Sequence, residues 1–411
     1  GITYDSDVLR LMSAYQEQGL YVGSVVITKY SGQESSVLFK SRLEKLGIKV
    51  YRHYVIPGYT SNVPYIVSDE GYGKNDYIET SRPLAVVTAP GPGSGKMAVC
   101  LSQLYQEHRR GISAGYAKFE TFPIWNIPLK HPVNLAYEAA TADLNDVNMI
   151  DPFHLEAYGE TTVNYNRDVE IFPVLNAMFQ RIYGESPYKS PTDMGVNMAG
   201  NCICDDEACK EASCQEILRR YYDSLKRLLF GTCPDSEVVK IEMLMNQANI
   251  TVHDRPVVDA ALGRAEETGS PAAALQLHDG RIITGKTSNL LGASAALLLN
   301  ALKELSGIDH KRHVISPEAI EPIQKLKTLY QGSKNPRLHT DEVLNALSVS
   351  AATDPTAQLA LDQLPKLRGC QAHTSVMVGS VDMKQFKKLS IQATFEAKYE
   401  KNSILFNRNG I

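Results

Sequence analysis

A β-branched run, a glycine turn and the start of a periodic helix follow one another over residues 84–100, which read LAVVTAPGPGSGKMAVC. A buried strand that leads through glycines into a helix leaves backbone N–H groups free to bind an anion, and the helix dipole reinforces them. We therefore expect a strand over residues 84–89, a helix over residues 96–108, and a phosphate-binding turn between them. This layout restricts the surrounding region to an α/β architecture.

The glycine turn supplies the candidate phosphate-binding residues. They are Gly91, Gly93, Ser94, Gly95 and Lys96. The Walker A pattern requires glycine at its first position and Ser or Thr after the lysine, but Pro90 and Met97 stand there. The turn therefore favours a phosphorylated ligand over ATP hydrolysis. The alternative is a tight strand-to-helix turn in which glycine only provides space for the backbone.

Length and composition limit the class of protein. A chain of 411 residues predicts two or three domains. A net charge of -4 with mixed signs lacks the basic face of a duplex-binding protein, so we expect no nucleic-acid partner. No apolar stretch reaches the roughly 20 residues that cross a bilayer, and we expect no membrane partner.

The cysteine count bears on the compartment. Seven cysteines, an odd number in a large chain, fit a reducing environment better than a disulfide scaffold, so we expect a cytoplasmic protein. The chain begins with Gly1 rather than methionine, so we leave open the possibility that a segment with a targeting peptide precedes it.

Strand and helix patterns alternate in the N-terminal third of the chain. Residues 21–28 and 48–56 have strand character, and residues 35–46 between them have the spacing of a helix. This alternation predicts a mainly parallel sheet covered by helices on both faces. Ligands of such sheets bind beyond the carboxyl ends of the strands, where the glycine turn falls.

We expect three domains. Residues 1–130 form an α/β domain with the glycine-rich loop, residues 131–265 a helix-rich middle domain with a polar loop, and residues 266–411 a C-terminal α/β domain. The last of these contains a hairpin signal at Asp279-Gly280, a long apolar helix at residues 293–305, and a strand at residues 375–379.

The polar segment over residues 151–168 reads DPFHLEAYGETTVNYNRD and suits a functional loop. Its candidate catalytic residues are Glu160, Arg167 and Asp168. The guanidinium of Arg167 matches a phosphate or carboxylate, and Asp168 or Glu160 can act as a base or hold a metal ion. A hydrogen-bonded interdomain loop is the alternative, and His154 is a further candidate.

A group of cysteines does not support a metal site. It consists of Cys202, Cys204, Cys209 and Cys214. The spacings differ from those of zinc ligands, and a helix from residue 205 places Cys209 and Cys214 on different faces. We expect free thiols and no metal site.

Residues 332–339, GSKNPRLH, carry two cations before a helix. Thr340 as the N-cap of that helix, with Asp341 and Glu342 behind it, accounts for this pattern better than a second anion site. No G-x-S-x-G, H-E-x-x-H or G-x-G-x-x-G motif occurs, so dinucleotide oxidoreduction has little support.

Three stretches together resemble an uncharacterised bacterial family, the domain of unknown function numbered eighteen-forty-six. They are TAPGPGSGKMAVC, the run over residues 115–168, and GSKNPRLH. The resemblance covers essentially the whole chain. It implies a multidomain bacterial cytosolic protein, and it brings no reaction with it.

The hairpin, the Thr284-Gly285-Lys286 triplet and the helix after Gly292 are similar to the opening of the cytidine-deaminase core. The zinc-binding H-x-E or C-x-E of that family is absent from residues 291–295, LGASA. This likeness implies a cytidine-deaminase-like topology without zinc ligands.

Two functional hypotheses follow. In the first, the protein is an enzyme of phosphoryl transfer or NTP-dependent ligation that uses a nucleotide with Mg²⁺: Lys96 and the loop amides stabilise phosphate charge, while Asp168 or Glu160 positions Mg²⁺ or a nucleophile. In the second, the protein is a non-catalytic metabolite sensor or scaffold, in which the same loop binds an anion and the helical middle domain forms a homo-oligomer. The missing hydroxyl after Lys96 favours the second. Metal-independent hydrolase or transferase chemistry is a third class, without a supporting triad.

Overall fold

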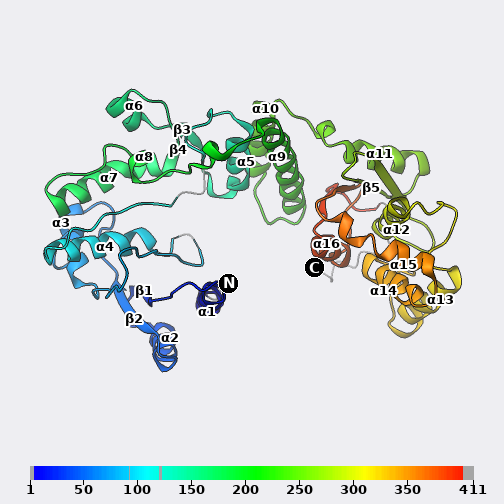
Figure 1. Cartoon of the computed structure of the whole chain (residues 1–411), viewed down its shortest axis with the longest axis horizontal. Coiled ribbons are helices and arrows are strands. Elements are labelled where there is room, and N and C mark those ends of the chain that lie inside the picture. Colours follow the sequence, from blue (N-terminus) through cyan, green and yellow to red (C-terminus); the bar gives the residue numbers. More distant parts are fainter. Residues whose placement is uncertain (1–3, 92, 120–122, 401–411) are drawn as a thin grey trace. The chain divides into compact units, whose positions relative to one another are not determined.

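The computed structural model describes residues 4–91, 93–119 and 123–400 and divides the chain into two units, each made from two stretches. Unit 1 contains Gly1–Ile127 and Val147–Cys202, and unit 2 contains Pro128–Asp146 and Ile203–Ile411. Figure 1 shows the elements of both units in the colours of the sequence.

Two parallel strands begin unit 1. Strands β1 (Ser24–Tyr30) and β2 (Lys49–Tyr54) pair from Ser24 with Lys49 onward, and α2 (Glu34–Lys45) connects them. Helix α1 (Tyr4–Glu17) precedes them. The predicted strand, helix and strand of this region are therefore confirmed, together with their parallel pairing.

The prediction of a third strand over residues 84–89 is wrong. This segment has no regular secondary structure and no ladder partner among the described residues. Leu84 and Val86 are each 79% exposed. Strand propensity expresses how well β-branched side chains pack on a half-buried sheet. No strand pairs with this segment among the described residues, so its side chains have no sheet to pack on.

Helix α4 (Lys96–Arg109) forms as predicted and packs beside α7 (Asn166–Tyr183). Their facing sides share one apolar core that includes Leu101, Leu104, Phe172 and Phe179. Figure 1 shows the cyan α4 and the green α7 lying alongside each other. The short α3 (Val63–Ile66) and η1 (Tyr72–Lys74) complete this core.

The functional loop predicted over residues 151–168 is regular structure instead. Helix α6 (Pro152–Tyr158), strand β4 (Val163–Tyr165) and the start of α7 occupy it, and β4 pairs antiparallel with β3 (Asn148–Ile150). The elements are too short to show a hydrophobic period, which explains the error. Helix α8 (Pro191–Met194) and η3 (Ala199–Cys202) end unit 1.

Three helices form a separate apolar cluster in unit 2. They are α5 (Pro132–Ala140), α9 (Asp206–Leu229) and α10 (Asp235–Gln247), with the short η2 (Ala142–Leu144). Asp205 caps α9 by accepting the N–H of Ala208, and Lys226 and Arg227 lie in its last turn, where they complement the helix dipole. The helices expected in the middle of the chain are confirmed.

A four-stranded sheet in the order β6-β5-β7-β8 forms the second core of unit 2. The strands are β5 (Ala272–Gln276), β6 (Ile282–Lys286), β7 (Gln371–Thr374) and β8 (Gln392–Phe395). Strand β5 is antiparallel to both β6 and β7, as the hairpin signal predicted for β6, and β7 is parallel to β8. No strand forms at residues 375–379, because β7 ends at Thr374. The likeness to the deaminase core stays a prediction.

Helices surround this sheet. Apolar side chains of α12 and of the helices beyond it fill the core against β5 and β7. The remaining elements of unit 2 are η4 (Val252–Asp254), α11 (Pro256–Thr268), α12 (Ala293–Ser306), α13 (Pro317–Lys325), η5 (Leu326–Tyr330), α14 (Thr340–Ala351), α15 (Pro355–Leu361), η6 (Leu364–Leu367) and α16 (Ser380–Lys388). Among the described residues, no helix has both the length and the apolar character needed to cross a membrane.

Candidate functional site

The glycine turn leads into α4 with a backbone that only glycine adopts easily. Gly93 and Gly95 have φ of 70° and 88°, and Gly95 is the N-cap of α4. Among the described residues no side chain caps this helix, so the N–H groups of its first turn are available to solvent or a ligand. Nζ of Lys96 donates to the carbonyl oxygen of Gly91 at 3.3 Å, which places the cation over the turn.

Strand β1 anchors the turn. Oγ1 of Thr28 donates to the carbonyl oxygen of Ser94 at 2.8 Å, and a Cβ on Gly95 would lie 3.3 Å from Cγ2 of Thr28. The Oγ of Ser94 is buried and has no hydrogen-bond partner among the described residues. The turn is therefore held in place while its own polar groups keep bonding capacity.

Helices α4 and α7 run in the same direction. His108, near the end of α4, packs edge to face against Tyr183, the last residue of α7, with ring centroids 5.5 Å apart. Because these helix ends meet and the two helices share core residues further back, their first turns lie toward the same end of unit 1. The first turn of α4 contains Lys96, and that of α7 contains Arg167 and Asp168.

Four side chains gather at the start of α7. Nζ of Lys118 forms an ion pair with Asp168 and donates to the hydroxyl of Tyr165 at 2.7 Å. The guanidinium of Arg167 lies 5.6 Å from the centroid of the same tyrosine ring and is exposed. The predicted pair Arg167 and Asp168 is thus part of one polar cluster, whereas Lys118 was not among the predicted site residues.

Glu160, the third candidate, lies elsewhere. Its carboxylate is 70% exposed and lies 3.9 Å from Nε2 of His154. Nδ1 of His154 is 2.9 Å from the buried Oγ of Ser190, and both residues are buried. The structure therefore joins Glu160 to His154 rather than to Asp168.

The buried Asp151 connects α6 to the start of α8. Its carboxylate caps α6 by accepting the N–H groups of Phe153 and His154, and it also accepts the N–H and the hydroxyl of Thr192. An Asp followed by Pro before a helix is a capping signal that identifies this role in the sequence.

Part of the polarity around segment 332–339 is used within the protein, and Arg337 lies 3.5 Å from Glu400. Nζ of Lys327 donates to the carbonyl of Arg337 and pairs with Glu342, while His339 lies 3.5 Å from Asp382. The predicted N-cap Thr340 is wrong: α14 begins at Thr340 and its N-cap is His339, while Asp382 accepts both the N–H and the hydroxyl of Thr340. The carboxylates of Glu342 and Asp382 thus pair with cations and donors around this segment.

The cysteines carry no disulfide, and all seven are free thiols. Across residues 4–91, 93–119 and 123–400, no group of three or more His, Cys, Asp or Glu side chains is placed to hold a metal ion.

A buried titratable cluster in unit 2 was not predicted. His373 is fully buried, and its Nδ1 lies 2.8 Å from Oγ1 of Thr394. Its Nε2 lies 3.3 Å from Oε1 of Glu396, an ion-pair distance without hydrogen-bond alignment. Burial lowers the pKa of His373, although Glu396 opposes this; His373 in turn holds the pKa of Glu396 below its ordinary value. The pairing of β7 with β8 brings these groups together, and no local sequence pattern indicates that pairing.

Comparison with known proteins gives matches over the whole chain. A family model described as the domain of unknown function DUF1846, N-terminal, matches residues 1–249, and its C-terminal counterpart matches residues 253–405. A UPF0371 protein of Corynebacterium diphtheriae is 58% identical over 99% of this chain and 82% of its own length. A UPF0371 protein of Streptococcus thermophilus is 58% identical over 97% of this chain and 81% of its own length.

Proposed function

This chain belongs to the family defined by the DUF1846 domains, whose function is unknown, and from its geometry we propose that it binds a phosphorylated small molecule at the start of α4. The observation that carries the proposal is the uncapped first turn of α4 behind Gly95, with Lys96 folded over it. Backbone N–H groups at a helix start, a glycine that permits close approach and an exposed ammonium together match a phosphate group.

The cluster at the start of α7 supports the same ligand. It adds the first turn of a second helix at the same end of unit 1, together with the cations of Lys118 and Arg167. Asp168 then acts as a positioning residue that holds Lys118, rather than as a base. Glu160 belongs to the surroundings of His154 and is assigned no catalytic step.

The reaction class remains a choice between two proposals. If the protein is an enzyme of phosphoryl transfer or NTP-dependent ligation, nucleotide binding at the turn strengthens with Mg²⁺. The side chain of Met97 packs against the apolar core at the position where P-loops place the Mg²⁺-binding hydroxyl. This observation favours the second candidate, a non-catalytic metabolite sensor or scaffold that binds the anion without metal.

We propose a cytoplasmic location, which the seven free cysteines favour. In the sensor proposal the protein forms a homo-oligomer through α5, α9 and α10, the cluster of three helices in unit 2.

Calorimetric titration of the full chain with inorganic phosphate, AMP and ATP, with and without Mg²⁺, tests the proposal. Replacing Lys96 with alanine removes one charge-assisted contact and should weaken phosphate affinity about tenfold or more. Lys45→Ala changes an exposed lysine at the end of α2 and serves as the matched control. Equal affinities for the Lys96→Ala and native proteins would contradict the assignment, and Mg²⁺ dependence separates the enzyme from the sensor.

A further inference from the structure

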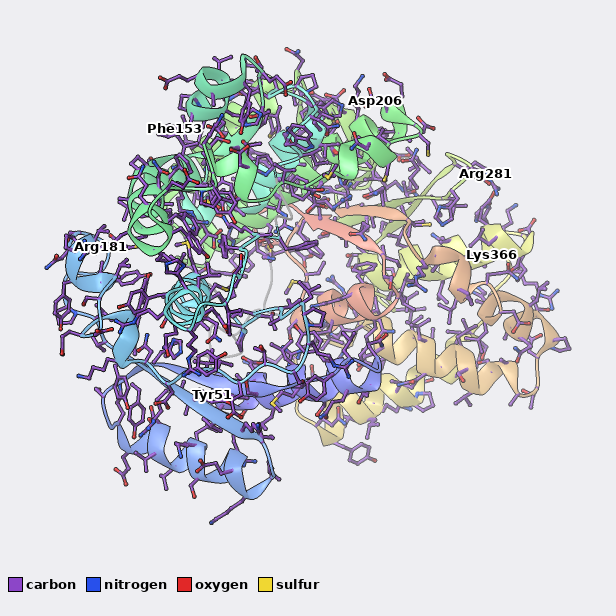
Figure 2. All side chains as sticks on the ribbon, turned by 60° about the vertical axis from the view of Figure 1, so that its left-hand side comes forward. Tyr51, Phe153, Arg181, Asp206, Arg281 and Lys366 are labelled. Atoms are coloured by element: carbon purple, nitrogen blue, oxygen red, sulfur yellow. The ribbon has the colours of Figure 1, made fainter. Side chains whose placement is uncertain are left out.

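A cavity of about 610 Å³ opens on unit 1 between α6, α7 and the turn that follows α7. Phe153 and Glu156 of α6 line it, Asn176 and Gln180 of α7 lie on its wall, and the turn adds residues 184–189. Figure 2 labels Phe153 on α6 and Arg181 on α7, the next residue after Gln180. The depression is wide open to solvent, and its volume falls in the range of small-molecule sites.

Four polar side chains lining this cavity share one property. They are Glu156, Asn176, Gln180 and Glu185. Glu156, Gln180 and Glu185 are exposed to solvent and Asn176 is half-buried, and none of the four side chains has a hydrogen bond or ion pair with another described group. Side chains that hold the fold together in this unit, such as Asp151, use their bonding capacity within the protein. The cavity therefore presents two carboxylates and two carboxamides with unused donors and acceptors.

Aromatic rings supply the apolar part of the lining. Phe153 stacks at a tilt on Phe172, with centroids 4.9 Å apart, and Tyr188 packs on Phe179 at 4.8 Å. Burial raises the pKa of Tyr188, whose hydroxyl donates to the carbonyl of Tyr116. Because the rings are fixed by these partners, they form a preorganised surface.

Charge distinguishes this cavity from the phosphate site. Glu156 and Glu185 outnumber the one cation, Lys189, whose Nζ lies 5.5 Å from the ring centroid of Tyr158. The net negative lining repels phosphate and carboxylate ligands. A neutral or amine-bearing ligand with many hydroxyl groups fits instead, since each hydroxyl both donates and accepts, as carboxamides do.

We propose that this cavity binds a saccharide. Asn176 and Gln180 hold ring hydroxyls through donor and acceptor bonds, Glu156 and Glu185 accept from hydroxyl or amino groups, and the rings of Phe153 and Tyr188 cover the apolar C–H face of the sugar. Within the turn after α7, the hydroxyl of Ser186 donates to the carbonyl of Tyr188 and helps to hold the ring of Tyr188 in place. The site is separate from the start of α4 and takes a different chemical class.

Titration of the full chain with glucose, glucosamine, maltose and inorganic phosphate, followed by calorimetry and ligand-observed NMR, tests this assignment. We expect millimolar or tighter binding of a sugar, and a loss of about tenfold in affinity for Gln180→Ala or Asn176→Ala, since each removes hydrogen bonds to the ligand. Glucosamine should bind more tightly than glucose, and Glu185→Gln should reduce that preference.

Matched variants keep the outcome clear. Glu170→Gln alters an exposed carboxylate on α7 outside the cavity and should leave sugar affinity unchanged. Gln180 is itself exposed, so Gln180→Ala retains the native melting temperature even where Asn176→Ala does not. Lys96→Ala should leave sugar binding intact, which separates this site from the phosphate proposal. The inference is overturned if no sugar binds at millimolar concentration, or if Gln180→Ala binds as tightly as the native chain.

Discussion

The guanidinium of Arg255 donates to Oε1 of Gln371 across 2.6 Å and so ties the start of α11 to the first residue of β7. Arg255 is fully buried, and burial lowers its pKa to about 9. Its remaining donors bond to neutral acceptors, namely Gln215 Oε1, Thr394 Oγ1 and the carbonyl oxygens of Ala372 and Gln392. One side chain thus joins α9, α11 and two strands of the sheet.

Arg255→Lys should destabilise unit 2 by about 3 kcal/mol, because an ammonium cannot reach acceptors arranged for a planar fork and leaves several of them unsatisfied. Urea unfolding followed by circular dichroism measures this loss. Arg220→Lys at an exposed pair with Glu216 is the control and should stay within about 0.5 kcal/mol of the native protein. An unchanged unfolding midpoint for Arg255→Lys would show that the fork geometry is dispensable.

Stability should fall as pH falls from about 7 toward 5. The pKa of His373 is lowered in the folded protein, so the unfolded chain takes up a proton near pH 6.5 that the folded chain does not. The contribution is therefore complete above the unfolded pKa and is lost below it. The lowered pKa of Glu396 acts in the same direction at more acid pH.

Melting temperatures measured by differential scanning calorimetry across this range test the assignment. His373→Gln should show a shallower decline, whereas His313→Gln, at an exposed position, should decline as the native protein does. An identical slope for His373→Gln and the native chain would assign the pH dependence to other groups.

How much of the fold is visible in the sequence depends on the range of the interactions. The spacing of apolar residues identifies α4, and Gly95 marks its start, since both signals are local. The β-branched run at Leu84 looks identical to a buried strand, because exposure is decided by neighbours that the run itself does not encode.

The candidate site shows the same division. Its turn was found from glycines and a lysine within six residues, but Lys118 and Asp168 meet from positions fifty residues apart. The sequence predicts Thr340 as a helix N-cap, but its N–H donates to Asp382, a residue of another helix. Composition identifies which groups are available, and only packing decides which of them are already paired.

Asp168→Asn should destabilise unit 1 by about 1–2 kcal/mol, because it leaves the partly buried Lys118 without its carboxylate. The side chains are 27% and 13% exposed, so solvent screens the pair less than a surface pair. Glu79→Gln breaks the exposed pair with Lys49 and should leave the midpoint of the same urea titration nearly unchanged, because solvent screens that pair. Equal losses for the two variants would show that burial adds nothing to the Lys118 pair.

Gly285 lets α12 lie directly on β6. A Cβ at this position would come within 2.3 Å of the backbone nitrogen of Leu297 and 2.6 Å of its Cα, closer than any side chain can approach. Gly285→Ala must therefore push the helix off the sheet, and we expect a loss of about 3 kcal/mol as well as a loosened core. Gly263, inside α11, has open space around its Cβ position and a helical backbone. Gly263→Ala should accordingly stabilise the same unit by about 0.5–1 kcal/mol through helix propensity alone. Opposite shifts in the urea midpoints of these two variants would establish that close backbone contact, and not glycine content, fixes the distance between α12 and the sheet; a stabilising Gly285→Ala would refute it.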